Sequence, residues 1–253
     1  MIPKLIFKTW LSCFSQTERI LIHSDPVKIK YLNDPIYLQD AYEDLTDRFR
    51  SKTDFDFFYE AITTNENKSL FLEIASTYLF LCKRGDWVVN VPHRSNPVID
   101  YFTNSFKLTV LCALIECLYG SERWITFSDY LLQRANKDKY PITDSLQLKE
   151  LLGTYSQKFG ATKRLEKFLS CLPANTLDGL LKKCKINGQV ATVKGLANIL
   201  YHERSDFVHN AQFVLLLSAP IFDRVGEKDV FNEIPISDLM EAFEIGLVKH
   251  FST

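Results

Sequence analysis

The chain has 253 residues, of which 46% are hydrophobic and 24% charged, and 30 basic against 31 acidic residues give a net charge of −1. This composition is that of a globular protein and excludes a disordered or fibrous one. The near-zero net charge also excludes a protein that holds nucleic acid by bulk positive charge, so any such partner must meet a local basic patch.

The first part of the chain is expected to form a smaller α+β or helical region. Asp34 followed by Pro35 is typical of a helix start, with proline in the first turn. The predicted elements are a β hairpin or edge pair over residues 4–10 and 19–23, then helices over residues 35–49, 54–62 and 67–82. Prolines at 92 and 97 make residues 87–100 the most linker-like stretch. We therefore predict an N-terminal region over residues 1–98, with a sensing or partner-binding role, and a second domain over residues 99–253.

The second domain is predicted to be almost wholly helical. Short gaps between its amphipathic segments favour antiparallel packing, and Gly120 stands where a left-handed helix cap would be expected. A stretch over residues 213–221 fits either a strand or a buried helical turn. The predicted helices span residues 99–119, 128–135, 144–159, 162–171, 176–185, 190–210 and 236–251. The fold class is therefore mainly α.

Location follows from the apolar runs and the cysteines. The longest apolar run, residues 108–119, is shorter than the ~20 residues of a membrane helix and is interrupted by Glu116, so no membrane span is expected. The N-terminal residues lack the pattern of a secretory signal. Six scattered cysteines without a C-x-x-C pair favour reduced thiols. We expect a cytoplasmic protein.

Common catalytic motifs are absent from the sequence. It contains no phosphate-binding glycine loop, no G-x-S-x-G and no H-E-x-x-H. His202 and His209, seven residues apart, share a helix face but have no third ligand in spacing. The sequence therefore predicts no bound metal and no cofactor.

One segment concentrates positive charge. Residues 149–194 contain nine basic residues against three acidic ones, a local charge of +6. Such a concentration fits either solvated helix faces or an anion-binding surface. The candidate RNA-binding residues in this segment are Lys163, Arg164, Lys167, Lys182, Lys183 and Lys185.

The most informative segment is residues 200–210, L-Y-H-E-R-S-D-F-V-H-N, where ionisable groups crowd a helix that is otherwise apolar. A charge beside a packed face is costly unless it has a partner. One interpretation is structural: Arg204 pairs with a buried carboxylate and His209 caps a polar network.

The same residues resemble a known family. Arg204 followed by His209 is similar to the R-x(4–6)-H signature of the HEPN superfamily of helical domains, and the local form resembles the branch that contains ApeA-like antiphage proteins. Residues 106–120 resemble that branch's first core helix, with its A-L-x-E-x-L-x-G pattern. Asn210 departs from the glycine that is usual there. The resemblance covers residues 100–253 and implies an antiparallel helical bundle.

The resemblance also implies a chemistry. HEPN ribonucleases act as dimers, and RNA supplies its own nucleophile in the 2′-hydroxyl. His209 would act as general base or acid, and Arg204 would stabilise charge on the phosphate. Ser205 would add a hydrogen bond. Because five residues turn a helix by about 140°, Arg204 and His209 lie on different faces, so we expect a homodimer that meets across this helix.

Three neighbouring residues are expected to support the site. Glu116 is the carboxylate expected to pair with Arg204, either to orient it or to take part in catalysis. Tyr201 fits a core position with a tethered hydroxyl or a base-stacking platform. His202 fits either a solvent-facing position or a substrate contact.

The leading prediction is a metal-independent endoribonuclease of an antiphage or toxin type that leaves a 2′,3′-cyclic phosphate. Its partners would be RNA, including tRNA, and an inhibitor or regulatory protein. The alternatives are a non-catalytic HEPN module that binds nucleotide or protein, and an adaptor that recruits a partner through its N-terminal hairpin.

Overall fold

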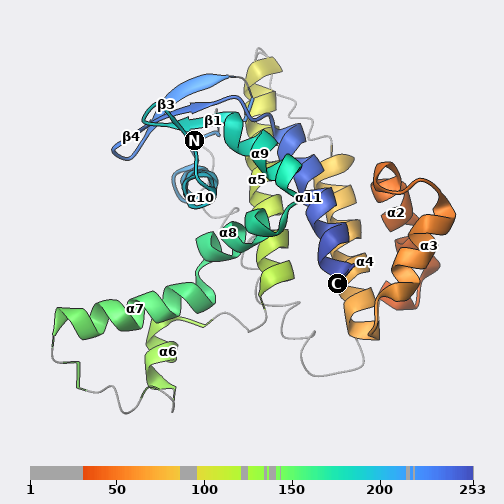
Figure 1. Ribbon diagram of the computed structural model, residues 1–253, viewed down its shortest axis with the longest axis horizontal. Helices are drawn as coiled ribbons and strands as arrows, with labels where there is room; N and C mark the ends of the chain where they lie inside the picture. The colour runs from red at the N-terminus through yellow and green to blue at the C-terminus, as the bar shows by residue number, and fades with distance from the viewer. Residues whose placement is uncertain are drawn as a thin grey trace. The chain divides into compact units, whose positions relative to one another are not determined.

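The computed structural model describes residues 31–85, 96–120, 125–133, 136, 141–142, 144–214, 217–218 and 220–252 (Figure 1). The hairpin expected over residues 4–10 and 19–23 lies outside them. The chain divides into two compact units, one of Met1–Leu79 with Phe251–Thr253 and one of Phe80–His250. The boundary expected between residues 98 and 99 stays a prediction.

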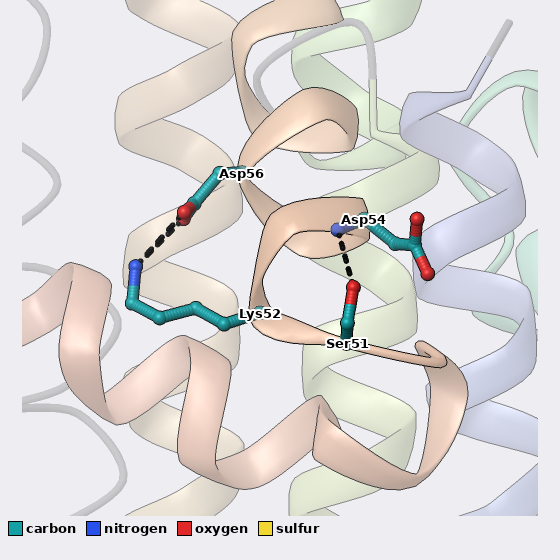
Figure 2. Close-up of polar contacts among 4 residues, drawn as sticks. All are labelled: Ser51, Lys52, Asp54 and Asp56. Atoms are coloured by element: carbon teal, nitrogen blue, oxygen red, sulfur yellow. Dashed lines mark hydrogen bonds and ion pairs between the residues drawn. The ribbon is translucent and has the colours of Figure 1, made fainter.

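Unit 1 is helical where it is described, and polar side chains define where its helices begin. Asp34, Ser51 and Thr64 each accept a hydrogen bond from a backbone N–H in the first turn of the helix that follows. Figure 2 shows Ser51 capping one helix and Lys52, the first residue of that helix, paired with Asp56 one turn later. These helices are α2 (Pro35–Leu45), α3 (Lys52–Ala61) and α4 (Asn65–Tyr78), with a 3₁₀ turn over Thr46–Arg48.

The core of unit 1 is aromatic. Phe55 and Phe71 are fully buried, and their ring centroids lie 6.4 Å apart. Phe49 meets Phe55 edge to face, and Phe251 meets Phe71 in the same way. Such ring pairs add to the free energy gained by burial, so this cluster fixes the positions of α3 and α4.

Unit 2 is mainly helical, as predicted. The expected ranges hold to within a few residues for most helices, and Ile236–Phe251 agrees at both ends. A π-helical turn, Leu79–Lys83, precedes them. The helices are α5 (Asn96–Tyr119), α6 (Phe127–Leu132), α7 (Ser145–Phe159), α8 (Ala161–Cys171), α9 (Ala174–Lys182), α10 (Val193–Asn210) and α11 (Ile236–Phe251). Helices α5, α8 and α10 pack against one another.

A small antiparallel sheet, which the sequence analysis did not predict, accompanies these helices (Figure 1). The turn after β1 has positive φ at Asn187 and Gly188, as a two-residue hairpin requires, and Gly226 has positive φ in the turn after β3. Within the stretch 213–221, expected to be a strand or a buried helical turn, the described residues before Ile221 form neither, and a strand begins only at Ile221. The strands are β1 (Cys184–Ile186), β2 (Gln189–Val190), β3 (Ile221–Val225) and β4 (Lys228–Asn232), in the order β2-β1-β4-β3.

Gly120 does not form the left-handed cap that was expected after α5, because among the described glycines only Gly188 and Gly226 have positive φ. The glycine is instead explained by the lack of room for a side chain at this position. A Cβ at position 120 would lie 2.6 Å from the Glu116 carbonyl oxygen and 2.9 Å from Nη1 of Arg164. The end of α5 therefore leaves no room for a side chain.

Helix α5 is also strongly apolar. Its residues Asp100–Tyr119 have a mean hydropathy of 1.2 and are long enough to cross a membrane, and 56% of this stretch is buried inside the protein. The core helix of a soluble protein meets the same test. The expectation of no membrane span, which counted only the uninterrupted run 108–119, therefore stays a prediction.

Candidate functional site

Helix α10 carries the residues that the sequence analysis singled out. Thr192 caps its start by accepting a hydrogen bond from the Gly195 N–H. The helix ends at Asn210, and Ala211 takes the left-handed conformation, with φ 55° and ψ 31°. One stripe of the helix is buried in unit 2: Leu196, Ala197, Ile199, Leu200 and Phe207.

The chain after α10 is tied to α5. The Val214 N–H donates to Oγ of Ser105 at 2.7 Å, and Ser105 donates in turn to the Tyr101 carbonyl. Nδ2 of Asn104 lies 2.9 Å from Oγ of Ser218. These bonds fix the course of the chain directly after the motif.

Arg204 lies against α5, next to the carboxylate expected to pair with it. Its Nη2 is 3.9 Å from Oε1 of Glu116, and the two side chains are 19% and 25% exposed. Its guanidinium carbon lies 5.5 Å from the centre of the Tyr201 ring, one turn earlier on α10. Tyr201 therefore packs beside Arg204, and its expected choice between a tethered core role and base stacking stays open.

A second arginine meets the same residue of α5. Nη1 of Arg164, on α8, donates to the Glu116 carbonyl oxygen at 3.3 Å. We call Glu116, Arg164 and Arg204 the Glu116 junction. Burial raises the pKa of the neighbouring Cys112 to about 12, an effect that Arg204 opposes and Glu116 reinforces. Cys112 therefore remains a neutral thiol and is no nucleophile at neutral pH.

His209 is exposed and lies in the last turn of α10, one residue before its end. Five residues separate it from Arg204, a rotation of about 140°, and among the described residues no hydrogen bond or ion pair joins the two side chains. Ser205 is partly exposed. The two predicted catalytic residues therefore do not meet within one chain. This agrees with the expectation that they lie on different faces of the helix.

The face of α10 opposite Arg204 carries a polar series spaced four residues apart. Nδ1 of His202 is 3.0 Å from Oδ2 of Asp206, and Nδ2 of Asn210 donates to Oδ1 of Asp206 at 3.2 Å. Asn210, which stands where the resembled pattern has glycine, thus continues the helix and holds the Asp206 carboxylate, while Ala211 makes the turn. An oriented imidazole results, with Nε2 as its second nitrogen.

This series borders a pocket of about 450 Å³ between α10, the segment after it and strand β3. Burial, together with the nearby carboxylates of Asp223 and Asp206, raises the pKa of Glu203 in this pocket to about 7. We call this cavity the α10 pocket. Six of the residues that line it are His202, Glu203, Asp206, Phe213, Asp223 and Arg224.

The expected basic patch is divided. Lys182 and Lys185 are exposed, and Nζ of Lys167 lies 5.2 Å from the centre of the Tyr119 ring. The other three have partners within the protein: Lys163 with Glu166 at 2.8 Å, Lys183 with Asp238 at 2.5 Å, and Arg164 with the Glu116 carbonyl. Binding of RNA by these six residues stays a prediction.

No group of three or more His, Cys, Asp or Glu side chains is placed to hold a metal ion in the part of the chain that the structure describes. Comparison of the chain with protein-family models, with curated proteins and with solved structures finds no match.

Four residues of the pocket, Glu203, Asp206, Asp223 and Arg224, were not predicted as site residues from the sequence. Glu203 and Asp206 lie within the polar segment 200–210, and their spacing from His202 gave a usable signal. Asp223 and Arg224 lie on strand β3, which was not predicted, so nothing local placed them beside α10.

Proposed function

We propose that the chain is a metal-independent endoribonuclease of the HEPN type, with Arg204 and His209 as its catalytic residues. The observation that supports this most is the position of Arg204, whose guanidinium lies beside Glu116 and the Tyr201 ring while the His209 side chain is exposed on the last turn of the same helix. One group is thus held by the fold and the other is free to meet a substrate.

The proposed reaction needs only proton transfer and charge stabilisation. His209 removes the proton of a ribose 2′-hydroxyl, the 2′-oxygen attacks the adjacent phosphorus, and the bond from phosphorus to the 5′-oxygen breaks. A second imidazole protonates the departing 5′-oxygen. Arg204 donates hydrogen bonds to the phosphate oxygens as negative charge develops. The products are a 2′,3′-cyclic phosphate and a 5′-hydroxyl.

The reaction uses two imidazoles and an arginine around one phosphate, which is why we propose a homodimer. A twofold axis beside α10 would supply His209 from both copies and would let the Arg204 of one copy face the His209 of the other. This arrangement resolves the rotation of about 140° that separates the two residues on one helix. We further propose that the protein acts in the cytoplasm on RNA such as tRNA, as an antiphage or toxin protein. A regulatory or inhibitory partner protein would act with it.

The test is incubation of the purified protein with tRNA and total RNA in EDTA. We expect cleavage by the wild type and a loss of at least about 100-fold in His209→Ala and in Arg204→Ala, the factor typical of acid–base groups. Asp178→Asn, an exposed change on α9, is the matched control. Unchanged rates in both site variants, with melting temperatures intact, would overturn the assignment.

One observation favours a second function. Arg204 is only 19% exposed and already lies against Glu116 and Tyr201, as in a purely structural role. A non-catalytic module that binds nucleotide or protein would place it in this way. Such a module would be monomeric or heterodimeric by light scattering and would leave RNA intact, whereas the proposed nuclease is a homodimer.

A further inference from the structure

Hydrogen-bond acceptors and donors together line the α10 pocket. Glu203 and Asp206 come from α10, and Asp223 comes from β3, so carboxylates line two of its sides. Arg224 also lines the pocket, and β3 stands at the end of the strand order. The volume of about 450 Å³ lies in the ~300–1,000 Å³ range of ligand pockets.

An aromatic ring forms another part of the wall. Phe213 is 42% exposed, so one part of its ring is open to a ligand. Its position is fixed by ring contacts with Phe102 at 6.2 Å and with Phe207 at 6.4 Å. A ring held in place in this way offers a stacking surface for a flat ligand without further ordering.

Charge narrows the class of ligand. Three carboxylates oppose the entry of a phosphate group, and Arg224 opposes a small cation. A neutral, flat molecule with hydrogen-bond donors on one edge and acceptors on another satisfies both sets of groups. Among the RNA bases, guanine alone has two adjacent donors, at N1 and the 2-amino group, together with two adjacent acceptors at O6 and N7.

We propose that the α10 pocket receives a guanine base of the RNA, with Glu203 accepting from N1 and the 2-amino group, Arg224 donating to O6 and N7, and Phe213 stacking on the ring. The proposal rests on the ribonuclease function proposed above and gives it a base preference. His202 and Asp206 continue along α10 to the turn that carries His209, which places a bound guanine beside the proposed cleavage site.

Binding should depend on pH, because only an ionised carboxylate accepts two hydrogen bonds from guanine. The other titratable and charged groups that line the pocket are His202 and Asp206 on the same helix and Asp223 and Arg224 on β3, and of these the carboxylates of Asp223 and Asp206 raise the pKa of Glu203. The pKa of Glu203 is raised to about 7. Guanosine affinity should therefore increase between pH 6 and pH 8.

The test is calorimetric titration of the full chain at pH 8 with the four nucleosides, with inosine and with 7-deazaguanosine. We expect guanosine to bind most tightly. Inosine, which lacks the 2-amino group, and 7-deazaguanosine, which lacks N7, should each bind about tenfold or more weakly, the factor that one hydrogen bond to a charged group supplies. Glu203→Gln and Arg224→Gln should remove the preference, and Asp178→Asn should keep it.

The guanine pocket would be overturned by equal binding of all four nucleosides or by no binding. Stronger binding of agmatine, a guanidinium cation, than of guanosine would also overturn it. The analogues test it without any variant that could misfold. Since nucleosides contain no phosphodiester, the result is independent of cleavage. RNA cleavage without guanosine binding overturns the pocket alone, whereas guanosine binding without RNA cleavage in EDTA overturns the nuclease and leaves a guanine-binding site.

Discussion

On one face of α10, Arg204 lies beside the Glu116 carboxylate and the Tyr201 ring; on the other, Glu203 shares a cavity with Asp206 and Asp223. The first face places opposite charges together, and the second places like charges together with part of their water removed. One helix thus combines an attractive contact between opposite charges with a repulsive one between like charges, and a ligand has most to contribute where the charges repel.

The largest expected effect comes from adding a side chain at Gly120, beside the tightly packed Glu116 junction. Gly120→Ala places a Cβ 2.6 Å from the Glu116 carbonyl oxygen and should lower the free energy of unfolding by about 2 kcal/mol. Gly179→Ala in α9 is the control, since a Cβ there meets nothing within 4 Å, and it should stabilise by about 0.5–1 kcal/mol. Urea unfolding measures both. Equal effects would show that the junction is not tightly packed.

The next effect removes the charge opposite Arg204. Glu116→Gln should lower the free energy of unfolding by about 1–2 kcal/mol, less than for a fully buried pair, because both side chains retain some exposure. The exposed Glu150→Gln on α7 is the matched control. Thermal melts at low and high salt measure the loss. A change no larger than that of the control would mean that the packed face carries no electrostatic contact of consequence.

A smaller effect on stability, of opposite sign, is expected from replacing Glu203, on the face of α10 that borders the α10 pocket. Between its ordinary pKa of 4.5 and its raised value of about 7, Glu203 binds a proton in the folded state that the unfolded state lacks. The free energy of unfolding of the wild type should therefore fall as pH rises through this range. Glu203→Gln has no such step and should raise Tm at pH 8 by about 2–4 °C, with little gain at pH 4.5.

A pH series of melting temperatures measures this difference, and the exposed Glu227→Gln is its control. If Glu203→Gln lowered Tm at pH 8, the like charges around Glu203 would be better compensated than the geometry indicates, and the contrast between the two faces would disappear.

The smallest effect concerns the end that both faces share. Ala211 holds the left-handed conformation, in which its Cβ is strained, so Ala211→Gly should stabilise the protein by about 0.5 kcal/mol. Gly would leave both faces of α10 unchanged, and RNA cleavage and nucleoside binding should match the wild type. Chemical unfolding measures the gain. Destabilisation would contradict a left-handed residue at this position.

Local signals made much of the fold predictable. Asp34 and Asp144 cap their helices as polar residues before an apolar period do, and the ends of α11 follow from its own sequence. The hairpin at Asn187 and Gly188 also had a local signal, which the helical interpretation of residues 176–185 and 190–210 concealed. The pairing of Arg204 with Glu116 was anticipated through the family resemblance.

The rest depends on contacts between distant residues. Arg164 reaches the Glu116 carbonyl across 48 positions, and no local pattern indicates that it turns away from the solvent. Asp223 joins the α10 pocket only because β3 pairs with β4 and α10 lies beside it. A site assembled in this way cannot be seen from spacing within one segment.

The bond between Ser105 and Val214 closes a loop of 109 residues. Long loops close late because their entropy must be lost before the bond forms, while helices form locally and early. The last turn of α10 should therefore acquire its final direction among the slowest steps of folding. A newly made chain would therefore complete α10 as a local helix before the segment that follows it is tied to α5.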